Sequence, residues 1–320
     1  NSTAVKRHPA FNFRRSFYRP TSLPTPPHSF LKVDASPRRF VCSTRANAKR
    51  LRRPAPPSND LKTTATIITF NEAEHIREAC ESVSWADEIL VVDADSTDAT
   101  REIAAACGAR VLRRAWPGFA AQKQFAAESA RYDWIFSLDA DERVSPELRA
   151  AVEDLLYTKD EQLADGYRIA RRSFYMGRWI RGGGWYPDHQ LRFYRRTRGR
   201  WVGAHVHESV RMDEGARVET LRGGDLLHYT GRDAAYHHRM IGERYAPLAA
   251  LQAFEAGKRT TPLRIAVSAP AAFARSYLLK GGFRDGFPGY CIARFAAHHA
   301  FLKNLLLWEM VQKQRSEVRE

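Results

Sequence analysis

The stretch SLDADERV at residues 137–144 places Asp139 and Asp141 directly behind an apolar run. Because successive side chains of a strand point to opposite faces, these two carboxylates point to the same side. Carboxylates this close repel each other unless water or a cation lies beside them. The pair therefore predicts either a divalent-metal site or a solvated turn, and the two residues alone leave both open.

The elements that position this pair follow a regular alternation. Apolar runs predict strands at 63–69, 87–93, 109–116 and 133–141, and helical spacing predicts helices at 72–83, 98–108, 119–130 and 145–156. Short loops between alternating strands and helices are typical of an α/β fold, Rossmann-like, with a mostly parallel sheet and helices on both faces. Such sheets bind ligands beyond the carboxyl ends of their strands.

Polar clusters follow the ends of three of these predicted strands. They are TFNEAE at 69–74, DADSTD at 93–98 and DADE at 139–142. All three clusters are expected at one edge of the sheet, because parallel strands end on the same side. This convergence favours a metal or nucleotide site over chance placement.

The formal net charge of +15 lies mostly in the first part of the chain. Residues 1–59 hold thirteen Lys or Arg and the single acid Asp34, whereas the remaining residues carry a net charge of +3. A body with so small a charge bias argues against a nucleic-acid-binding protein. Residues 1–60, rich in Pro, Arg and Ser, are predicted to be a disordered basic leader.

Three interpretations of this leader remain open. Its first residue is Asn rather than Met, which favours an artefactual or truncated leader translated upstream of the true start. The Arg- and Ser-rich, acid-poor composition also fits an organellar transit peptide. A basic arm for an anionic surface is the third alternative.

Two further regions complete the domain organisation. Residues 61–232 are predicted to form the main domain, and within it 166–222 carries thirteen Arg against five acids, with interleaved Trp and Tyr. Such a segment fits stacking on sugar rings and pairing with phosphates, or an ordinary Arg-rich surface. Residues 233–320 are predicted to be helical and amphipathic, either in a membrane interface or packed on the main domain.

Several motifs occur in an order that matches a known family: TIITFNEAEHI, SVSWADEILVVDADSTDAT, WPGFAAQKQFA, DWIFSLDADERVSPEL, GGWYPDHQLRFYRR, VHESV and LLHYT. Over about residues 63–310 the chain resembles family-2 glycosyltransferases of the GT-A fold. More narrowly, it resembles bacterial enzymes that add a glucose to the heptose of the lipopolysaccharide inner core. The resemblance implies an inverting transfer of a hexose, glucose first, from a UDP-sugar donor.

The resemblance also assigns a donor site. Asp139 and Asp141 match the family's Asp-x-Asp motif, with Asp141 as the direct metal ligand and Asp139 shared between the metal and the ribose. Hard oxygen ligands suit Mg²⁺ or Mn²⁺. The other matches to nucleotide-binding positions are Thr69, Phe70, Glu72, Asp93, Asp95 and Lys123.

An inverting transfer needs one base that takes the proton of the acceptor hydroxyl. The resemblance implies Glu208 as the first choice and Asp188 as the second, and a structural salt bridge to an arginine is the alternative for each. His228 is expected to reach the diphosphate or to complete the metal shell. His205 and His207 share one face of a predicted strand.

The Arg-rich segment favours an anionic acceptor, such as the phosphorylated lipopolysaccharide inner core, and the C-terminal region favours one held at a membrane. We therefore expect a cytoplasmic protein in peripheral contact with the inner membrane, without a nucleic-acid partner. A polyprenyl-phosphate acceptor fits equally well. A nucleotidyltransferase is a further alternative, although the loop FNEAEH lacks the glycines that usually hold a triphosphate.

Overall fold

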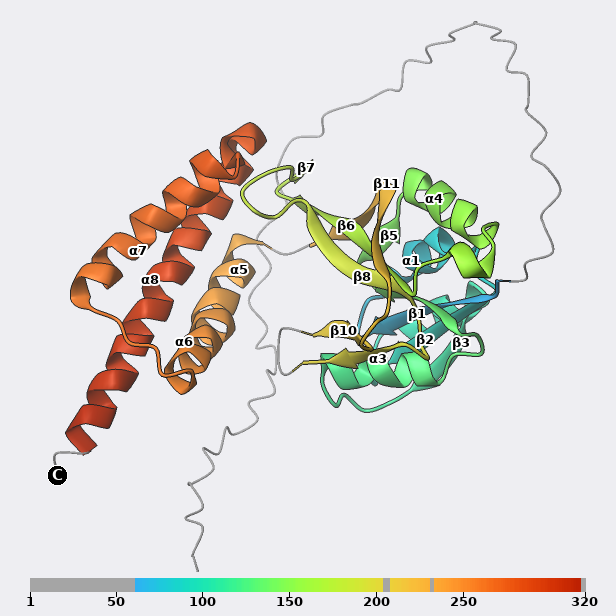
Figure 1. Ribbon diagram of the computed structural model, residues 1–320, viewed down its shortest axis with the longest axis horizontal. Helices are drawn as coiled ribbons and strands as arrows, with labels where there is room; N and C mark the ends of the chain where they lie inside the picture. The colour runs from blue at the N-terminus through green and yellow to red at the C-terminus, as the bar shows by residue number, and fades with distance from the viewer. Residues whose placement is uncertain (1–60, 204–207, 231–232, 318–320) are drawn as a thin grey trace, which may run out of the picture. The chain divides into compact units, whose positions relative to one another are not determined.

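The computed structural model describes residues 61–203, 208–230 and 233–317 (Figure 1). All of them belong to one compact unit that spans residues 54–320. The predicted leader at 1–60 and the histidines at 205 and 207 lie outside the described residues. The predicted boundaries after residues 60 and 232 therefore stay predictions.

A mixed sheet forms the centre of the described part of the chain. Its strand order is β3-β2-β1-β4-β8-β6-β11-β5, with β7 paired to β6, and β9 and β10 form a separate pair. The strands are β1 Thr63–Thr69, β2 Glu88–Asp93, β3 Arg110–Arg113, β4 Trp134–Asp139, β5 Glu142–Val144, β6 Gly166–Tyr175, β7 Arg178–Trp179, β8 Asp188–Arg195, β9 Gly199–Val202, β10 Ser209–Met212 and β11 Val218–Tyr229.

The four strands predicted from apolar runs, β1 to β4, pair in parallel. In this register Thr69 lies opposite Asp93, and Ile68 lies opposite Asp139. The carboxyl ends of β2, β1 and β4 therefore lie side by side. This confirms the predicted α/β class and the convergence of the polar clusters.

The other half of the sheet differs from a parallel arrangement. Strand β8 runs antiparallel to both β4 and β6, β11 runs parallel to β6, and β5 runs antiparallel to β11. These strands come largely from the Arg-rich segment, for which the only strand predicted from the sequence was the one that contains His205 and His207. The first half of the sheet is thus entirely parallel, whereas the second half combines antiparallel pairs with the parallel pair of β6 and β11.

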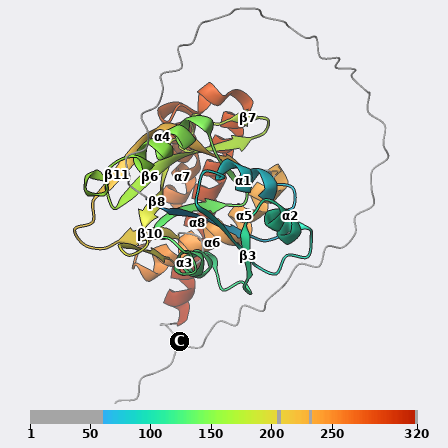
Figure 2. The same cartoon turned by 90° about the vertical axis from the view of Figure 1, so that its right-hand side faces the viewer.

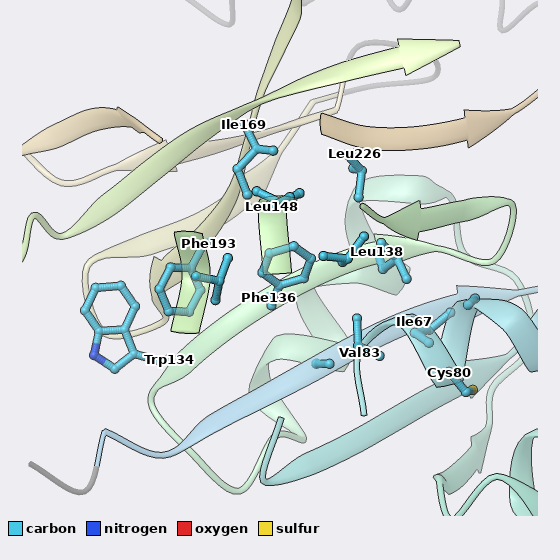
Figure 3. Close-up of a cluster of buried hydrophobic side chains, with 14 of the residues drawn as sticks. Ile67, Cys80, Val83, Trp134, Phe136, Leu138, Leu148, Ile169, Phe193 and Leu226 are labelled. Atoms are coloured by element: carbon cyan, nitrogen blue, oxygen red, sulfur yellow. The ribbon is translucent and has the colours of Figure 1, made fainter. Parts of the chain in front are cut away.

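Helices cover both faces of the sheet, as predicted. They are α1 Ile76–Ser82, α2 Thr100–Ala106, α3 Phe119–Glu128 and α4 Pro146–Leu156, with a short 3₁₀ turn at Asp160–Gln162. Ile67 of β1 packs in one core with Cys80 of α1 and Leu148 of α4 (Figure 3), whereas its neighbour Ile68 packs with Ala126 of α3. Figure 2 shows α4 and α3 on opposite sides of the sheet.

Helix α4 begins as its sequence predicts. Ser145 is the N-cap, and its side chain accepts a hydrogen bond from the backbone N–H of Leu148 at 3.1 Å, with Pro146 in the first turn. Gly224 of β11 passes close to this helix start, and a Cβ on Gly224 would lie 2.1 Å from the Leu148 backbone nitrogen. This contact packs β11 tightly against α4.

The C-terminal region is helical, as predicted. Its elements are α5 Ala234–Met240, a π-helical turn Ile241–Tyr245, α6 Ala246–Glu255, α7 Pro262–Ala274, a second π-helical turn Arg275–Leu279, a 3₁₀ turn Gly282–Asp285 and α8 Gly286–Glu317. Helices α6 and α7 pack against α8, and Figure 1 shows α7 beside it. Within the described ranges, every helix is too short or too polar to cross a lipid bilayer.

Candidate active site

Hydrogen bonds join the loops that follow β1 and β2. The backbone N–H of Asn71 donates to Ser96 Oγ at 2.8 Å, and the backbone N–H of Thr97 donates to Asn71 Oδ1 at 2.8 Å. The backbone N–H of Glu72 donates to Thr100 Oγ1 at 2.9 Å. These bonds hold the first two polar clusters together at one edge of the sheet.

Asp93 ends β2 with a fully buried side chain. Its Oδ1 atom accepts hydrogen bonds from the backbone N–H of Ser96 at 3.0 Å and from the guanidinium of Arg101 at 3.1 Å. Among the residues that the structure describes, its Oδ2 atom has no hydrogen-bond partner, although it is buried. Because buried polar atoms are normally satisfied, this oxygen is suited to accept a hydrogen bond from a ligand.

Asp95 and Phe70 lie at the rim of the same edge. Asp95 adopts a positive φ of 62°, and its Oδ1 atom lies 3.0 Å from the guanidinium of the exposed Arg113. The Phe70 side chain is exposed beside the buried Thr69. Both rim side chains therefore face solvent, where a bound ligand can reach them.

Two buried cations hold Asp139 at the end of β4. Lys123 Nζ from α3 lies 2.9 Å from Asp139 Oδ1, and a guanidinium nitrogen of Arg192 from β8 lies 3.1 Å from Oδ2. Burial raises the pKa of Asp139, but Lys123 and Arg192 lower it more, so the net pKa lies well below the usual range. The carboxylate is ionised at neutral pH without any metal beside it.

A buried glutamate, Glu142, extends this charge network. Its Oε1 atom lies 2.8 Å from Arg192 and 3.4 Å from Arg171, and its Oε2 atom accepts from the backbone N–H of Asp139 at 2.9 Å. Arg171 in turn lies 2.7 Å from Asp188. Asp188, the second-choice base, is thus held in a salt bridge.

Glu208, the first-choice base, lies on the other side of Lys123. Its Oε1 atom is 3.4 Å from Lys123 Nζ, and its side chain is 21% exposed. The same ammonium group lies 4.8 Å from the ring centroid of Trp201. One buried cation therefore contacts both Glu208 and Asp139.

Asp141 lies between two cavities. One, of about 220 Å³, is lined by Asp141, His228 and the aromatic side chains of Tyr175, Trp185, Tyr236 and Tyr245. The other, of about 310 Å³, is lined by Asp141 and the loop at 71–75. His228 Nε2 is 3.4 Å from Asp141 Oδ2, and its Nδ1 atom lies 3.2 Å from Ser173 Oγ.

The residues around Asp141 fit a metal ion only in part. Within the described ranges, no three side chains of His, Cys, Asp or Glu are grouped to hold one by themselves. Asp141 and His228 offer one carboxylate and one imidazole, whereas both oxygens of Asp139 contact cations. Because Mg²⁺ usually keeps waters and substrate phosphate oxygens as ligands, such an incomplete protein shell suits it.

Three members of the network, Glu142, Arg171 and Arg192, are not among the site residues predicted from the sequence. Arg192 stands between Leu191 and Phe193 in the middle of β8, and a charge flanked by large apolar residues is the one local signal that could have marked it. Glu142 gives no such signal, because it follows Asp141 in a polar stretch. It is buried where β5 pairs with β11 and where Arg192 and Arg171 approach it from β8 and β6.

Known proteins are similar to this chain over the part that holds these site residues. A family model described as "Glycosyl transferase family 2" matches residues 64–217. The "Lipopolysaccharide core biosynthesis glycosyltransferase LpsC" of Rhizobium meliloti (strain 1021) is 35% identical over 254 residues, 76% of this chain and 90% of LpsC. An uncharacterized glycosyltransferase of Rickettsia bellii (strain RML369-C) is 29% identical over 262 residues, 78% of this chain and 87% of that protein. The solved structure of S. aureus TarS 1-349 in complex with UDP-GlcNAc aligns with a TM-score of 0.42 and 15% identity, over 80% of this chain and 92% of that chain.

Proposed function

The chain belongs to glycosyl transferase family 2 and is a glycosyltransferase, and on this premise we propose that it transfers glucose from UDP-glucose to a lipopolysaccharide inner-core heptose. Its α/β fold is of the GT-A type. The observation that carries the proposal is the position of Asp93 and Asp139 at the ends of β2 and β4, on either side of β1, with Asp141 directly after β4. The similarity to LpsC, whose name states lipopolysaccharide core biosynthesis, supports the choice of acceptor.

The nucleotide would bind at the edge formed by the first two polar clusters. The buried Oδ2 atom of Asp93 is suited to accept the N–H of a uracil ring, and the exposed Phe70 offers a surface for stacking. Asp95 would reach the ribose after exchanging its contact with Arg113. Thr69 and Glu72 would contact the nucleotide from the end of β1 and from the loop that follows it.

A divalent cation, Mg²⁺ or Mn²⁺, would be held by Asp141 and His228 beside the diphosphate. When bound, it neutralises the charge that develops on the departing diphosphate. Asp139 would face the same group while Lys123 and Arg192 keep it ionised and fixed. Its predicted sharing between metal and ribose remains part of this proposal.

Glu208 would act as the base that takes the proton from the attacking hydroxyl. Its side chain is partly exposed, and Lys123 orients it without enclosing it. Asp188 is less suited, because Arg171 and Gln190 occupy both of its oxygens at 2.7 Å. A single base on the acceptor side is what an inverting displacement requires.

The acceptor would be anionic and held at a membrane. Arg178 and Arg181 of the Arg-rich segment are exposed, and the C-terminal region from Lys258 to Lys303 is strongly basic. These charges suit the phosphates of an inner core, and they suit a polyprenyl phosphate as well. The enzyme would accordingly work in the cytoplasm, at the inner face of the inner membrane.

A donor screen tests this proposal. Purified protein is incubated with UDP-, GDP- and dTDP-sugars and with nucleoside triphosphates, each with and without EDTA. We expect turnover of UDP-glucose alone, loss of turnover with EDTA and recovery with added Mn²⁺. Turnover that EDTA leaves unchanged contradicts the metal, and nucleotide transfer from a triphosphate favours the nucleotidyltransferase. Deacylated lipopolysaccharide core and a polyprenyl phosphate, offered in parallel, separate the two acceptors.

A further inference from the structure

A group of large apolar side chains is exposed where α7 leads into α8. Leu278, Leu279, Phe283, Phe287 and Tyr290 are exposed by 59%, 82%, 51%, 67% and 42%. We refer to these five residues as the apolar tip. Contiguous exposed apolar surface of this kind marks an interaction site rather than ordinary surface.

Ring contacts unite the apolar tip into one surface. The ring of Tyr277 lies 6.5 Å from that of Phe283 and 6.1 Å from that of Tyr290, measured between centroids. The ring of Phe287 stacks on that of Tyr290 at 6.3 Å. Tyr277, which is less exposed than the tip, therefore joins Phe283 to Tyr290, and Phe287 continues the patch along the start of α8.

The charges around the apolar tip are of one sign. Residues 256–308 contain eight Lys or Arg and a single acid, Asp285, which is fully buried. Arg275, Lys280 and Arg284 lie exposed within or beside the tip. Exposed apolar side chains bordered by cations are the pattern of a segment that lies in the interface of an anionic membrane.

Hydrogen bonds fix the turns beside the apolar tip to the strand region of the enzyme. The Asp285 carboxylate accepts from the backbone N–H groups of Arg181 at 3.0 Å and Gly182 at 2.7 Å. The backbone N–H of Gly183 donates to the Lys280 carbonyl at 2.9 Å. The chain from Arg181 to Gly183 continues directly into Trp185, which lines the aromatic cavity beside Asp141.

We propose that the apolar tip inserts into the headgroup region of an anionic phospholipid bilayer and that Arg275, Lys280 and Arg284 pair with lipid phosphates. The inference deepens the proposed function and rests on it in one respect: docking here holds the aromatic cavity close to a membrane-bound acceptor. Lipid binding itself is independent of sugar transfer. The two can therefore fail separately.

Sedimentation with vesicles tests the docking. The full chain and its variants are mixed with vesicles of pure phosphatidylcholine or of phosphatidylcholine with phosphatidylglycerol, at low and at raised salt. The variants are Leu279→Glu in the apolar tip, Lys280→Glu beside it and, as a matched control, Leu251→Glu on α6, where Leu251 is 41% exposed. The basic residues 1–59 are common to all variants, so differences between variants report the tip.

We expect the full chain to bind the phosphatidylglycerol vesicles, Leu279→Glu to weaken that binding at least about tenfold, and Leu251→Glu to leave it unchanged. Lys280→Glu should weaken binding at low salt and have less effect at raised salt, where charges are screened. Equal binding by all variants overturns the proposal. So does an effect of Leu279→Glu on self-association alone, measured by light scattering, because the tip would then contact a second copy.

Hydrolysis of UDP-glucose in the absence of lipid is measured on the same samples. Leu279→Glu should hydrolyse the donor at the rate of the unmodified chain, because the tip lies outside the donor site. Vesicle binding without donor hydrolysis in the unmodified chain would refute the proposed function and leave the docking in place.

Discussion

The ammonium group of Lys123 lies 2.9 Å from Asp139 and 3.4 Å from Glu208, so one buried cation joins the end of β4 to the segment before β10. Lys123 is 3% exposed. It therefore holds Asp139, a member of the predicted Asp-x-Asp motif, and the proposed base Glu208 in one arrangement.

Lys123→Met should lower kcat by about 100-fold, because a misplaced base loses much of the advantage of its orientation. The KM for the donor should change less, since the nucleotide contacts proposed above come from other residues. Steady-state kinetics with UDP-glucose and acceptor measure both constants. Lys62→Met, which removes an exposed lysine before β1, is the control. An unchanged kcat for Lys123→Met would remove Lys123 from the site.

Arg192→Met should destabilise the fold by about 3–5 kcal/mol, because it removes the buried cation that Asp139 and Glu142 share. Asp139 would keep only Lys123, and the fully buried Glu142 would keep only the more distant Arg171 as a cationic partner. Urea unfolding of the variant and the unmodified chain measures the difference. The matched control is Arg149→Met, which breaks a surface pair with Glu153 and should cost less than about 1 kcal/mol. Equal losses of unfolding free energy in the two variants would mean that the buried network stabilises the fold no more than a surface pair does.

Glu208→Gln should lower kcat by about 10²–10⁴-fold with little change in stability, as expected when a general base is removed. Asp188→Asn should instead lower the free energy of unfolding, because it breaks the contact with Arg171, and should reduce kcat by less. Measuring kcat and urea unfolding for both variants separates the two roles. The reverse pattern would make Asp188 the base.

His237 should make stability depend on pH. Burial lowers its pKa below the ordinary value of 6.5, and its ring stacks on Phe295 with centroids 4.3 Å apart. The unfolded chain therefore binds a proton before the folded chain does, so stability is present above about pH 6.5 and is lost as pH falls. Thermal unfolding between pH 8 and pH 5 should show a smaller loss in His237→Phe. An equal loss of thermal stability in His237→Phe and the unmodified chain would contradict the role of His237.

Asp141→Asn should raise the Mn²⁺ concentration that gives half-maximal activity by at least about tenfold, because it removes a carboxylate ligand. His228→Ala should act in the same direction. The matched control is Asp133→Asn, which removes an exposed carboxylate that pairs with Arg196. Titration of metal-stripped enzyme with Mn²⁺ gives the three values. An unchanged Mn²⁺ requirement in Asp141→Asn would exclude Asp141 as a ligand.

The first half of the sheet was predictable because its strands are short apolar runs that alternate with regularly spaced helices. Every residue of β1 is buried, and the helices between the strands follow a regular apolar spacing. Periodicity of this kind depends only on local sequence and the hydrophobic effect. The position of Asp93 and Asp139 at one edge follows from it directly.

The second half was not predictable because its strands carry charges toward the interior. In β6 and β8, Arg171 and Arg192 point to buried acids rather than to solvent, so the usual alternation of apolar and polar residues is lost. The contact of Glu208 with Lys123 joins elements far apart in the chain. No local sequence pattern predicts such a contact.

The Asp285 carboxylate limits how relatives of this enzyme can be recombined. It is bound to the backbone of Arg181 and Gly182, so the helices after residue 233 are fitted to one particular course of the chain ahead of β8. A chimera joined at residue 233 would pair a carboxylate from one parent with a backbone from another. A functional chimera therefore requires residues 181–182 and Asp285 to come from the same parent.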